Sequence, residues 1–483
     1  MKREYHFVLY VIGLMLVVLG CAMLVPCLLD ALTGNKEWTV FLASGGFTIF
    51  MGGGLAFSNR GGEVTLSGST GYLLTAGSWI VLSAFASLPL ILGYPDIPFT
   101  DAVFETISAL TTTGSTVLIG LDNMPPGILM WRSIAQWIGG VGIVLMAMIL
   151  LPALRVGGMR LFLSESSDIS GKPFPRIESI LKEVGLVYLT LTVLCTLALF
   201  VAGMSFFDAV NHAMATIATG GYSTKDASVG YYHSLPIEII IGIFMISGAL
   251  PLIFYSKLFR RTRTAFATDL QVSAFFKVLI TAILACAIWN VFENHMAAGM
   301  ALRQSFFNVT SVLTDTGFAT TDFSLWGPFP MGIFFLLLFI GGCAGSTSGA
   351  IKIFRWQILF AGLKVQLMQM FSPNRVLVLR YGKRTVDIEM ATSVWNFLFI
   401  YMLSFAILSL AVMVTGLDFL SSTSAVAQAM ANAGPGLGPV VGPGTNFAAI
   451  PDTAKWILML AMISGRLEVA VVYAMFMKEF WRR

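Results

Sequence analysis

The chain has few charged residues. Only 11% of its 483 residues are Asp, Glu, Lys or Arg, whereas soluble domains carry about 25%. Hydrophobic residues make up 57% of the chain, and the mean hydropathy is +0.82. Apolar runs near or above the ~18 residues of a spanning helix recur throughout, and the alternating segments of about ten residues that form membrane β-barrels are not seen. The composition therefore predicts an all-α polytopic membrane protein.

Residues that commonly bind metals or act as nucleophiles are also sparse. Five cysteines are scattered inside apolar segments and form neither a metal-site spacing nor a disulfide framework: Cys21, Cys27, Cys195, Cys286 and Cys343. The four histidines lie far apart in the sequence, so no nucleophile–base arrangement is evident. No Gly-Lys-Ser/Thr closes a phosphate-binding loop. The sequence thus predicts no enzyme activity and no nucleotide site in this chain.

Basic residues gather between certain apolar segments and at both ends of the chain. They are Lys2, Arg3, Arg155, Arg160, Lys172, Arg176, Lys182, Lys257, Arg260, Arg261, Arg263, Arg355, Lys364, Arg375, Arg380, Lys383, Arg384, Lys478, Arg482 and Arg483. Because cytoplasmic loops are enriched in Lys and Arg, these loops and both termini are expected on the cytoplasmic side. Each cluster adjoins a membrane segment, so a nucleic-acid partner is not expected.

Four short polar stretches, each ending in glycine, lie between long apolar segments. They are Leu110–Gly114, Ile217–Gly221, Leu313–Gly317 and Met430–Gly434. Backbone without helix hydrogen bonds cannot face lipid, and it persists at membrane depth only when buried in protein or lining a water-filled path. Four such stretches in one chain indicate four quarters of one ion pore.

The stretches belong to longer repeats. Asp101–Gly114 aligns without gaps to Asp208–Gly221, and the third and fourth copies run from Gln304 and Ser421. A second signature follows each copy: Ile138-Gly-Gly140, Ile246-Ser-Gly248, Ile340-Gly-Gly342 and Ile463-Ser-Gly465. We therefore expect four units of helix, re-entrant segment and helix in a pseudo-fourfold arrangement, after two extra N-terminal helices. The expected boundaries are 1–70 for the N-terminal extension, then 71–156, 157–260, 261–365 and 366–483 for units 1 to 4.

This organisation predicts ten spanning helices. They are expected at 6–29, 38–58, 74–94, 127–151, 183–203, 236–256, 271–293, 330–357, 392–415 and 454–479. An even number of spans agrees with both termini lying on one side of the membrane.

The polar stretches suit a cation filter. A cation that enters a membrane loses its hydration, which rings of backbone carbonyls can replace, and glycine permits the backbone angles that this requires. The expected filter residues are Thr112, Thr113, Gly114, Thr219, Gly220, Gly221, Asp315, Thr316, Gly317, Asn432, Ala433 and Gly434. The alternative is that the glycines only allow close helix packing, but four aligned copies favour the filter.

The chain resembles the TrkH/TrkG family of potassium-uptake subunits, within the larger group of Trk, Ktr and HKT transporters. The resemblance covers nearly the whole length and rests on the filter stretches and on Gln136–Gly140, Val156–Gly158, Gly341–Gly349 and Gly465–Glu468. In this superfamily glycine at all four filter positions accompanies potassium preference, whereas serine in the first accompanies sodium transport. Gly114 therefore implies potassium. Asp315 departs from the neutral residue expected there, and its carboxylate could either raise cation occupancy or bind the protein internally.

A glycine- and serine-rich run in mid-membrane is the second candidate site. Its residues are Gly341, Gly342, Gly345, Ser346, Thr347, Ser348 and Gly349. Such a run breaks a helix and is tolerated only beside a cavity. By resemblance it gates the ion path together with Arg466, a charge deep in an apolar segment. The alternatives are a closely packed kink for the run and a structural ion pair with Glu468 or another acid for Arg466.

The remaining polar residues on or near the re-entrant segments are expected to have mainly structural roles. Asp101, Glu105, Asp208, His212 and Asn308 are expected as caps or hydrogen bonds between helices, with a minor share in attracting cations. Lys352 is expected to mark the cytoplasmic boundary.

The resemblance also implies the setting of the protein. It implies a bacterial inner (plasma) membrane location, contact with membrane lipid, a homodimer, and a cytoplasmic nucleotide-binding regulatory subunit of the TrkA type. The transported ion is expected to be potassium, with rubidium passing by its similar size, either passively or by symport with protons or sodium. A secondary transporter of a small organic solute, with its site at broken helices, and a membrane-embedded enzyme are the alternatives.

Overall fold

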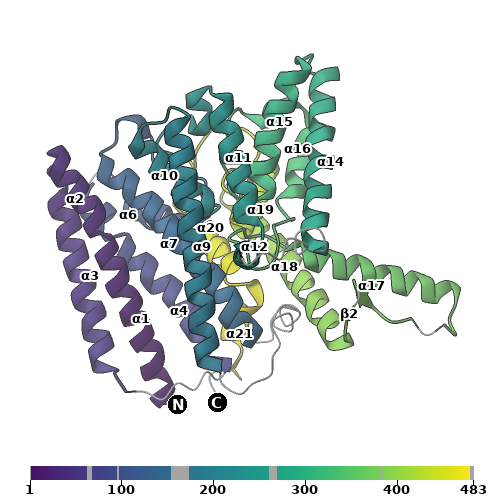
Figure 1. Cartoon of the computed structure of the whole chain (residues 1–483), viewed down its shortest axis with the longest axis horizontal. Coiled ribbons are helices and arrows are strands. Elements are labelled where there is room, and N and C mark those ends of the chain that lie inside the picture. The colour runs from purple at the N-terminus through teal and green to yellow at the C-terminus, as the bar shows by residue number, and fades with distance from the viewer. Residues whose placement is uncertain are drawn as a thin grey trace.

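The computed structural model describes residues 2–61, 68–94, 97–153, 173–259, 269–375, 377–382 and 384–478. This part of the chain is mostly helical, with one small antiparallel pairing of β1 (Arg380–Tyr381) and β2 (Arg384–Thr385). The predicted motif and basic residues outside it are Val156–Gly158, Arg155, Arg160, Lys172, Arg260, Arg261, Arg263, Lys383, Arg482 and Arg483. Figure 1 shows the two chain ends near each other on the lower side.

The helices are grouped by the predicted extension and four units, whose boundaries stay predictions. The extension holds α1 (Lys2–Ala22), α2 (Leu24–Thr33) and α3 (Trp38–Ser58). Unit 1 holds α4 (Gly68–Ala86), α5 (Leu88–Gly93), α6 (Phe99–Leu110) and α7 (Pro126–Ala153). Unit 2 holds α9 (Pro173–Val201), α10 (Phe206–Ile217), α11 (Leu235–Ala249) and α12 (Leu252–Phe259). Unit 3 holds α14 (Leu270–Phe292), α15 (Ala298–Leu313), α16 (Pro328–Leu337) and α17 (Ile353–Phe371). Unit 4 holds α18 (Ile388–Val414), α19 (Phe419–Ala431), α20 (Asp452–Arg466) and α21 (Val469–Phe476).

By length and composition, seven helical segments of the described chain could cross a membrane. They are Tyr5–Thr33, Trp38–Ser58, Thr70–Gly93, Pro126–Val144, Lys182–Val201, Leu270–Phe292 and Ile388–Val414. Each coincides with one of the ten predicted spans. The other three predicted spans lie in the second halves of units 2, 3 and 4.

Those three spans are interrupted. The spans concerned are 236–256, 330–357 and 454–479. The prediction of continuous helices is wrong for 236–256 and 454–479, whereas the break within 330–357 is the one expected from the glycine- and serine-rich run. α11 ends at Ala249 because Pro251 has no N–H to continue the helix. The glycine- and serine-rich run separates α16 from α17. α20 ends at Arg466, and two residues later Glu468 has a φ of +61°, outside the helical region.

The short helices α6, α10, α15 and α19, which we call the re-entrant helices, lie between longer ones. α10 packs against α9 of its own unit and α7 of unit 1, and α15 packs against α14 and against α11 of unit 2. α6 packs against α7 and also against α20 of unit 4. The first and last units are therefore neighbours, and the chain closes into a ring.

Ion pairs join neighbouring units in this ring. Lys455 of α20 lies 2.5 Å from Asp101 of α6. Arg303 of α15 donates two hydrogen bonds of 2.7 Å to the carboxylate of Glu238 on α11. Removing one partner of a buried pair costs about 3–5 kcal/mol because an unpaired charge remains. The ring is thus fastened by charge as well as by apolar packing.

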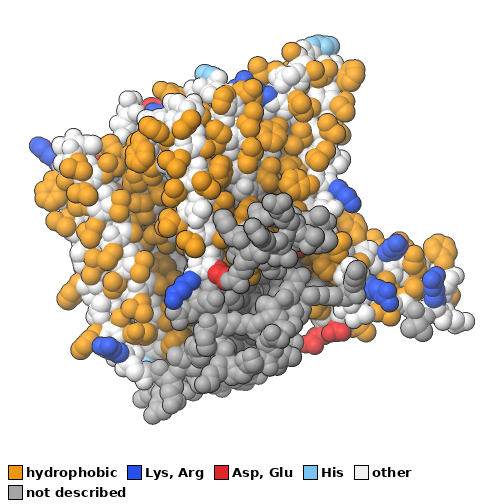
Figure 2. Space-filling model, viewed as in Figure 1, with side chains coloured by type: hydrophobic (Ala, Val, Ile, Leu, Met, Phe, Trp, Pro, Cys, Tyr) orange, Lys and Arg blue, Asp and Glu red, His pale blue; other side chains and the backbone are white. Residues whose placement is uncertain are grey.

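The outer surface of the described helices is apolar. Figure 2 shows hydrophobic side chains over most of the visible lateral face, with many Lys and Arg near its margins and on α17, which extends away from the body. On α18, Phe399 is 68% exposed and Val414 is 88% exposed. Such surfaces are stable in lipid and not in water. The chain is a multi-pass membrane protein.

Candidate functional site: a four-glycine constriction and the loop beneath it

The four polar stretches share one backbone conformation. The residue two positions before each final glycine has a positive φ: Thr112 52°, Thr219 50°, Asp315 58° and Asn432 58°. Non-glycine residues rarely adopt these angles, and such residues cluster at functional sites. The final glycines also have positive φ values: Gly114 83°, Gly221 77°, Gly317 89° and Gly434 89°. All four re-entrant helices therefore end in the same turn.

The hydrogen bonds of these turns are also repeated. In each stretch the N–H before the final glycine donates to the carbonyl five residues earlier, with N···O distances from 2.8 to 3.0 Å. The donor and acceptor residues are Thr113 and Ser108, Gly220 and Ala215, Thr316 and Ser311, and Ala433 and Gln428.

The four glycines meet at one place. In three cases a Cβ on the glycine would overlap or crowd the carbonyl oxygen that precedes the glycine of the next unit. The pairs are Gly114 with Gly220, Gly221 with Thr316, and Gly317 with Ala433. A Cβ on Gly434 would lie 2.6 Å from the Cα of Gly317. Backbone oxygens from different units thus converge on a constriction that tolerates no side chain.

A pocket of about 80 Å³ opens where the chain leaves this constriction, and all four glycines line it. Ser115, Tyr222 and Arg132 also line it. Gln136 of α7 reaches the same region, where its amide donates to the carbonyl of Gly220 at 2.6 Å and accepts from the N–H of Tyr222 at 3.1 Å. A side chain of unit 1 thereby fixes the filter stretch of unit 2.

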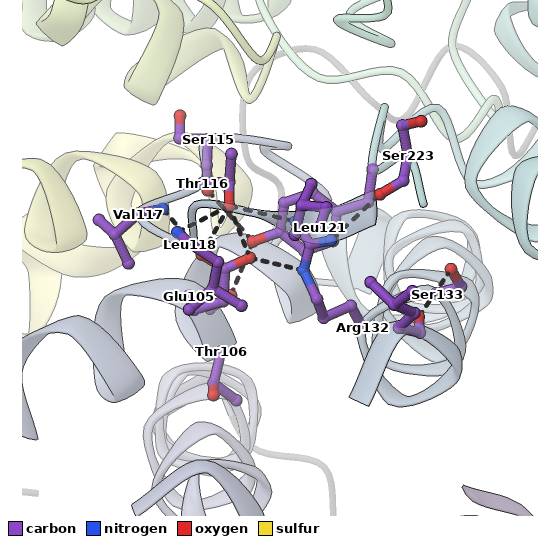
Figure 3. A network of polar contacts seen from close by, with 12 residues as sticks. Glu105, Thr106, Ser115, Thr116, Val117, Leu118, Leu121, Arg132, Ser133 and Ser223 are labelled. Atoms are coloured by element: carbon purple, nitrogen blue, oxygen red, sulfur yellow. Dashed lines mark hydrogen bonds and ion pairs between the residues drawn. The ribbon is translucent and has the colours of Figure 1, made fainter. Parts of the chain in front are cut away.

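We call the segment that follows each final glycine the outgoing strand of its unit; it is not part of a β-sheet. A buried ion pair supports the outgoing strand of unit 1 (Figure 3). Nε of Arg132 donates to Oε1 of Glu105 at 2.7 Å, and the two side chains are 2% and 1% exposed. The Glu105 carboxylate also accepts from the N–H of Val117 at 2.9 Å and the hydroxyl of Thr116 at 3.1 Å. Arg132 donates further to the carbonyl of Ser223 at 3.1 Å. This pair therefore holds the outgoing strands of units 1 and 2 together.

The other units brace their outgoing strands with different residues. His212, nine residues before its glycine as Glu105 is, has Nε2 2.9 Å from the hydroxyl of Ser223. Asn308, at the same position of unit 3, donates to the hydroxyl of Thr320 at 2.9 Å and accepts from its N–H at 3.2 Å. In unit 4 the hydroxyl of Ser424 accepts from the N–H of Leu437 at 2.9 Å. From the sequence, His212 and Asn308 were expected to cap or join helices. Their contacts with the outgoing strands were not predicted.

Asp208 lies at the start of α10 and remains ionised. Burial raises the pKa of its carboxyl, but hydrogen bonds from the hydroxyls of Thr224 at 2.6 Å and Ser205 at 2.8 Å outweigh burial. The pKa of Asp208 is consequently lowered from its usual range. This carboxylate adds negative charge at the outer end of the re-entrant helix.

The second candidate site is the segment 338–352 between α16 and α17, which we call the gate loop. The Thr347 hydroxyl donates to the carbonyl of Ile217, at the end of α10, at 3.1 Å. The N–H of Ala350 donates to the carbonyl of Ala431, at the end of α19, at 2.9 Å. The loop therefore lies directly against the ends of the re-entrant helices, and it includes all seven predicted gate residues of the run.

Within the loop, Ser346 and Gly345 are held by hydrogen bonds to the loop itself and to α12. The Ser346 hydroxyl donates to the carbonyl of Cys343 at 2.6 Å, and the carbonyl of Gly345 accepts from the N–H of Leu252 at 3.0 Å. The break between α11 and α12 thus supplies an anchor for the loop.

Arg466 contacts the gate loop and not Glu468. Its Nη1 donates to the carbonyl of Thr347 at 3.1 Å, while Nε and Nη2 are buried with no hydrogen-bond partner among the described residues. Glu468 instead pairs with Arg355 at 2.6 Å. The alternative of an Arg466–Glu468 pair is therefore wrong. Arg355 was predicted only as a basic loop residue, yet it is 1% exposed.

Asp315 and Lys352 also belong to this site. Oδ2 of Asp315 accepts from the hydroxyl of Ser348 at 2.7 Å, so the carboxylate is bound internally, which is one of the two predicted alternatives. The ammonium of Lys352 donates to the carbonyl of Ser348. Lys352 thus does more than mark a boundary, because it holds the last part of the gate loop.

The second repeated signature consists of packing glycines. A Cβ on Gly139 would overlap the carbonyl oxygen of Leu110, and one on Gly465 would overlap that of Met430. A Cβ on Gly248 would lie 3.1 Å from the carbonyl oxygen of Ile217. These glycines let a long helix touch the end of a re-entrant helix.

Comparison with known proteins relates the chain to a family of cation transport proteins. A family model described as TrkH, cation transport protein, matches residues 38–482. The Trk system potassium uptake protein TrkI of Halomonas elongata is 45% identical over 413 residues, covering 85% of this chain and 84% of that protein. The Trk system potassium uptake protein TrkH of Escherichia coli is 37% identical, covering 99% of this chain and 100% of that protein.

The fold is similar to a solved structure over its full length. The crystal structure of the potassium transporter TrkH from Vibrio parahaemolyticus matches with a TM-score of 0.92 and 34% identity, covering 100% of both chains. The family match and these relatives agree with the resemblance seen in the sequence. This chain belongs to the TrkH family of cation transport proteins.

Proposed function

We propose that this chain carries potassium across the bacterial inner membrane through the four-glycine constriction, as the translocating subunit of a Trk-type uptake system. One observation carries the proposal: the four stretches adopt the same rare backbone conformation and bring their glycines and carbonyl oxygens together. Carbonyl oxygens replace the hydration shell of potassium in other filters. The names of the relatives support potassium as the ion.

The gate loop and Arg466 close the path on the inner side of the filter. The loop packs against the ends of the re-entrant helices, and Arg466 places a positive charge beside it. A fixed cation in a narrow path opposes the passage of potassium. Opening then requires the loop and Arg466 to move together.

The proposal also includes the membrane topology, the partners and the energy coupling of the chain. The chain spans the membrane ten times when the three interrupted helices are counted, with pseudo-fourfold symmetry and both termini in the cytoplasm. It forms a homodimer and receives a nucleotide-binding regulatory subunit of the TrkA type on its basic cytoplasmic loops. Transport is either passive or coupled to protons or sodium as symport.

The test is tracer flux into proteoliposomes that hold only this chain, comparing potassium, rubidium and sodium. Gly114→Ser is expected to reduce the preference for potassium over sodium, because its Cβ would overlap the carbonyl oxygen of Gly220. Gly120→Ser is the matched control, since Gly120 also has a positive φ (78°) but nothing lies within 4 Å of its Cβ position. Flux that does not distinguish the cations, or is equally changed by both variants, would refute the filter.

A further inference from the structure

Asp315 carries a carboxyl group that the proposed ion path does not use. At the same position the other three stretches have Thr112, Thr219 and Asn432, which have no carboxyl group. Asp315 is completely buried. Moving a carboxyl group from water into the protein interior is unfavourable. The fold therefore keeps this group at a cost to its own stability.

The carboxylate faces the gate loop from behind the filter. Its Oδ2 accepts from the hydroxyl of Ser348, and it lies 3.1 Å from where a Cβ of Gly341 would be, at the other end of the run. The Ser348 hydroxyl in turn accepts from the N–H of Gly342 at 2.7 Å. One carboxylate thus reaches both ends of the glycine-rich run.

Two cations hold the same part of the loop. Lys352 donates to the carbonyl of Ser348, and Arg466 donates to that of Thr347. The end of the gate loop is therefore held by two basic side chains and by the carboxyl group of Asp315.

We propose that Asp315 is a latch that keeps the gate loop closed through Ser348, a positioning residue that acts on the loop and not on the ion. This rests on the proposed function of the loop as a gate. Removing one partner of a buried hydrogen bond leaves the other partner unsatisfied, which is unfavourable. Withdrawal of the loop must break the Ser348–Asp315 bond, and this bond exists in only one of the four units.

The loop contains its own reporter, Cys343, whose side chain is completely buried. The test measures how fast a small water-soluble thiol reagent modifies Cys343 in the full-length protein, resolved by mass spectrometry. Asp315→Thr, which copies the residue of units 1 and 2, and Ser348→Ala are each expected to speed modification about tenfold or more, the equivalent of one buried hydrogen bond. The double variant should be no faster than Ser348→Ala, because Asp315→Thr removes only the bond to Ser348, which Ser348→Ala removes together with the bond from Gly342.

The chain offers matched controls. Ser311→Ala removes a buried hydroxyl that has no partner among the described residues, one turn before Asp315, and should not change the rate. Cys286, buried in α14, should stay unreactive in every variant. If Cys286 also reacts in Asp315→Thr, that variant is loosened, and Asp315→Asn and Ser348→Ala carry the test.

Ion flux distinguishes a role of Asp315 in holding the gate loop from a direct role in ion selectivity. The latch predicts faster potassium flux without a regulatory subunit in Asp315→Thr and Ser348→Ala, and an unchanged potassium-to-sodium ratio in Ser348→Ala, whose side chain lies outside the four polar stretches. Unchanged Cys343 modification, or additive effects in the double variant, would overturn the latch. A changed ion ratio with unchanged modification would overturn it as well, in favour of direct action on the ion. Faster modification in a chain that shows no potassium-selective flux in any variant would leave the latch standing and remove the proposed function.

Discussion

Gly139 and Gly465 set the distance between a long helix and the end of a re-entrant helix, because each lies against a backbone carbonyl. Gly114 and its three counterparts set a different distance, between units, and need positive φ as well. Two kinds of glycine therefore surround the constriction. One kind lies at helix contacts, as the packing interpretation expects, and the other lies where the four stretches meet, where its role in a filter stays a prediction.

The packing role of Gly465 leads to a stability prediction. Gly465→Ala is expected to lower the stability of the protein by about 1–3 kcal/mol, the range for overpacking a tight contact. The measurement is the melting temperature of the purified protein in detergent. Gly53→Ala in α3 is the control, because nothing lies within 4 Å of its Cβ position and alanine favours helix. Equal melting temperatures for both variants would contradict the packing role.

The Glu105–Arg132 pair leads to a second prediction for the substitution of a single residue. Glu105→Gln leaves Arg132 buried without its counter-ion, which typically costs about 3–5 kcal/mol. We expect a lower melting temperature and a weakened potassium preference, because the outgoing strand loses its main acceptor. Glu293→Gln, at an exposed helix end, should change neither quantity. A stable Glu105→Gln protein with normal ion preference would show that the brace is dispensable.

Interrupted helices surround the constriction. Seven predicted spans agree with the structure because each is a long apolar run. The breaks in 236–256 and 454–479 were missed because apolar composition continues across them, although Pro251 was visible in the sequence. The break between α16 and α17 was expected because its glycines and serines change the composition itself.

The braces behind the filter were harder to predict than the glycines. Glu105 and Arg132 are 27 residues apart in the sequence and their pairing is tertiary. Gln136 and Gly220 come from different units. The one available signal was a charge within an apolar segment, which drew attention to Arg466 and applies equally to Arg132.

The contact between Arg466 and the gate loop leads to a third prediction. Arg466→Ala removes a buried cation and its hydrogen bond to Thr347, so we expect higher potassium flux in proteoliposomes without a regulatory subunit. The potassium-to-sodium ratio should not change, since the filter backbone is untouched. Lys364→Ala on the exposed part of α17 is the control. A lower flux from correctly folded protein would mean that Arg466 supports conduction.

In the whole ring, two ion pairs join neighbouring units, and the acidic and basic partners are exchanged between them. Lys455 of unit 4 and Glu238 of unit 2 occupy the same position, ten residues before Gly465 and Gly248. One supplies the cation to its neighbour and the other the anion. The ring requires opposite charges at this level, with no preference for which helix carries which.

A charge exchange tests this requirement. Asp101→Lys and Lys455→Asp are each expected to lower the melting temperature, because each places two like charges where Asp101 and Lys455 now form an ion pair. The double exchange should recover most of the loss by restoring an opposite pair. A double variant as unstable as the sum of the single ones would indicate that the surroundings, and not the pair, hold units 1 and 4 together.

Because one continuous chain supplies all four stretches, a substitution appears once around the constriction. An assembly of identical subunits would repeat every substitution by symmetry, and four copies of Asp315 would crowd four carboxylates behind one filter. A single gene product can instead place Asp315 on one side, Asn432 on another and threonines on the remaining two. Gene duplication and fusion would therefore allow each quarter to specialise, so that one quarter can control opening while the others keep the path.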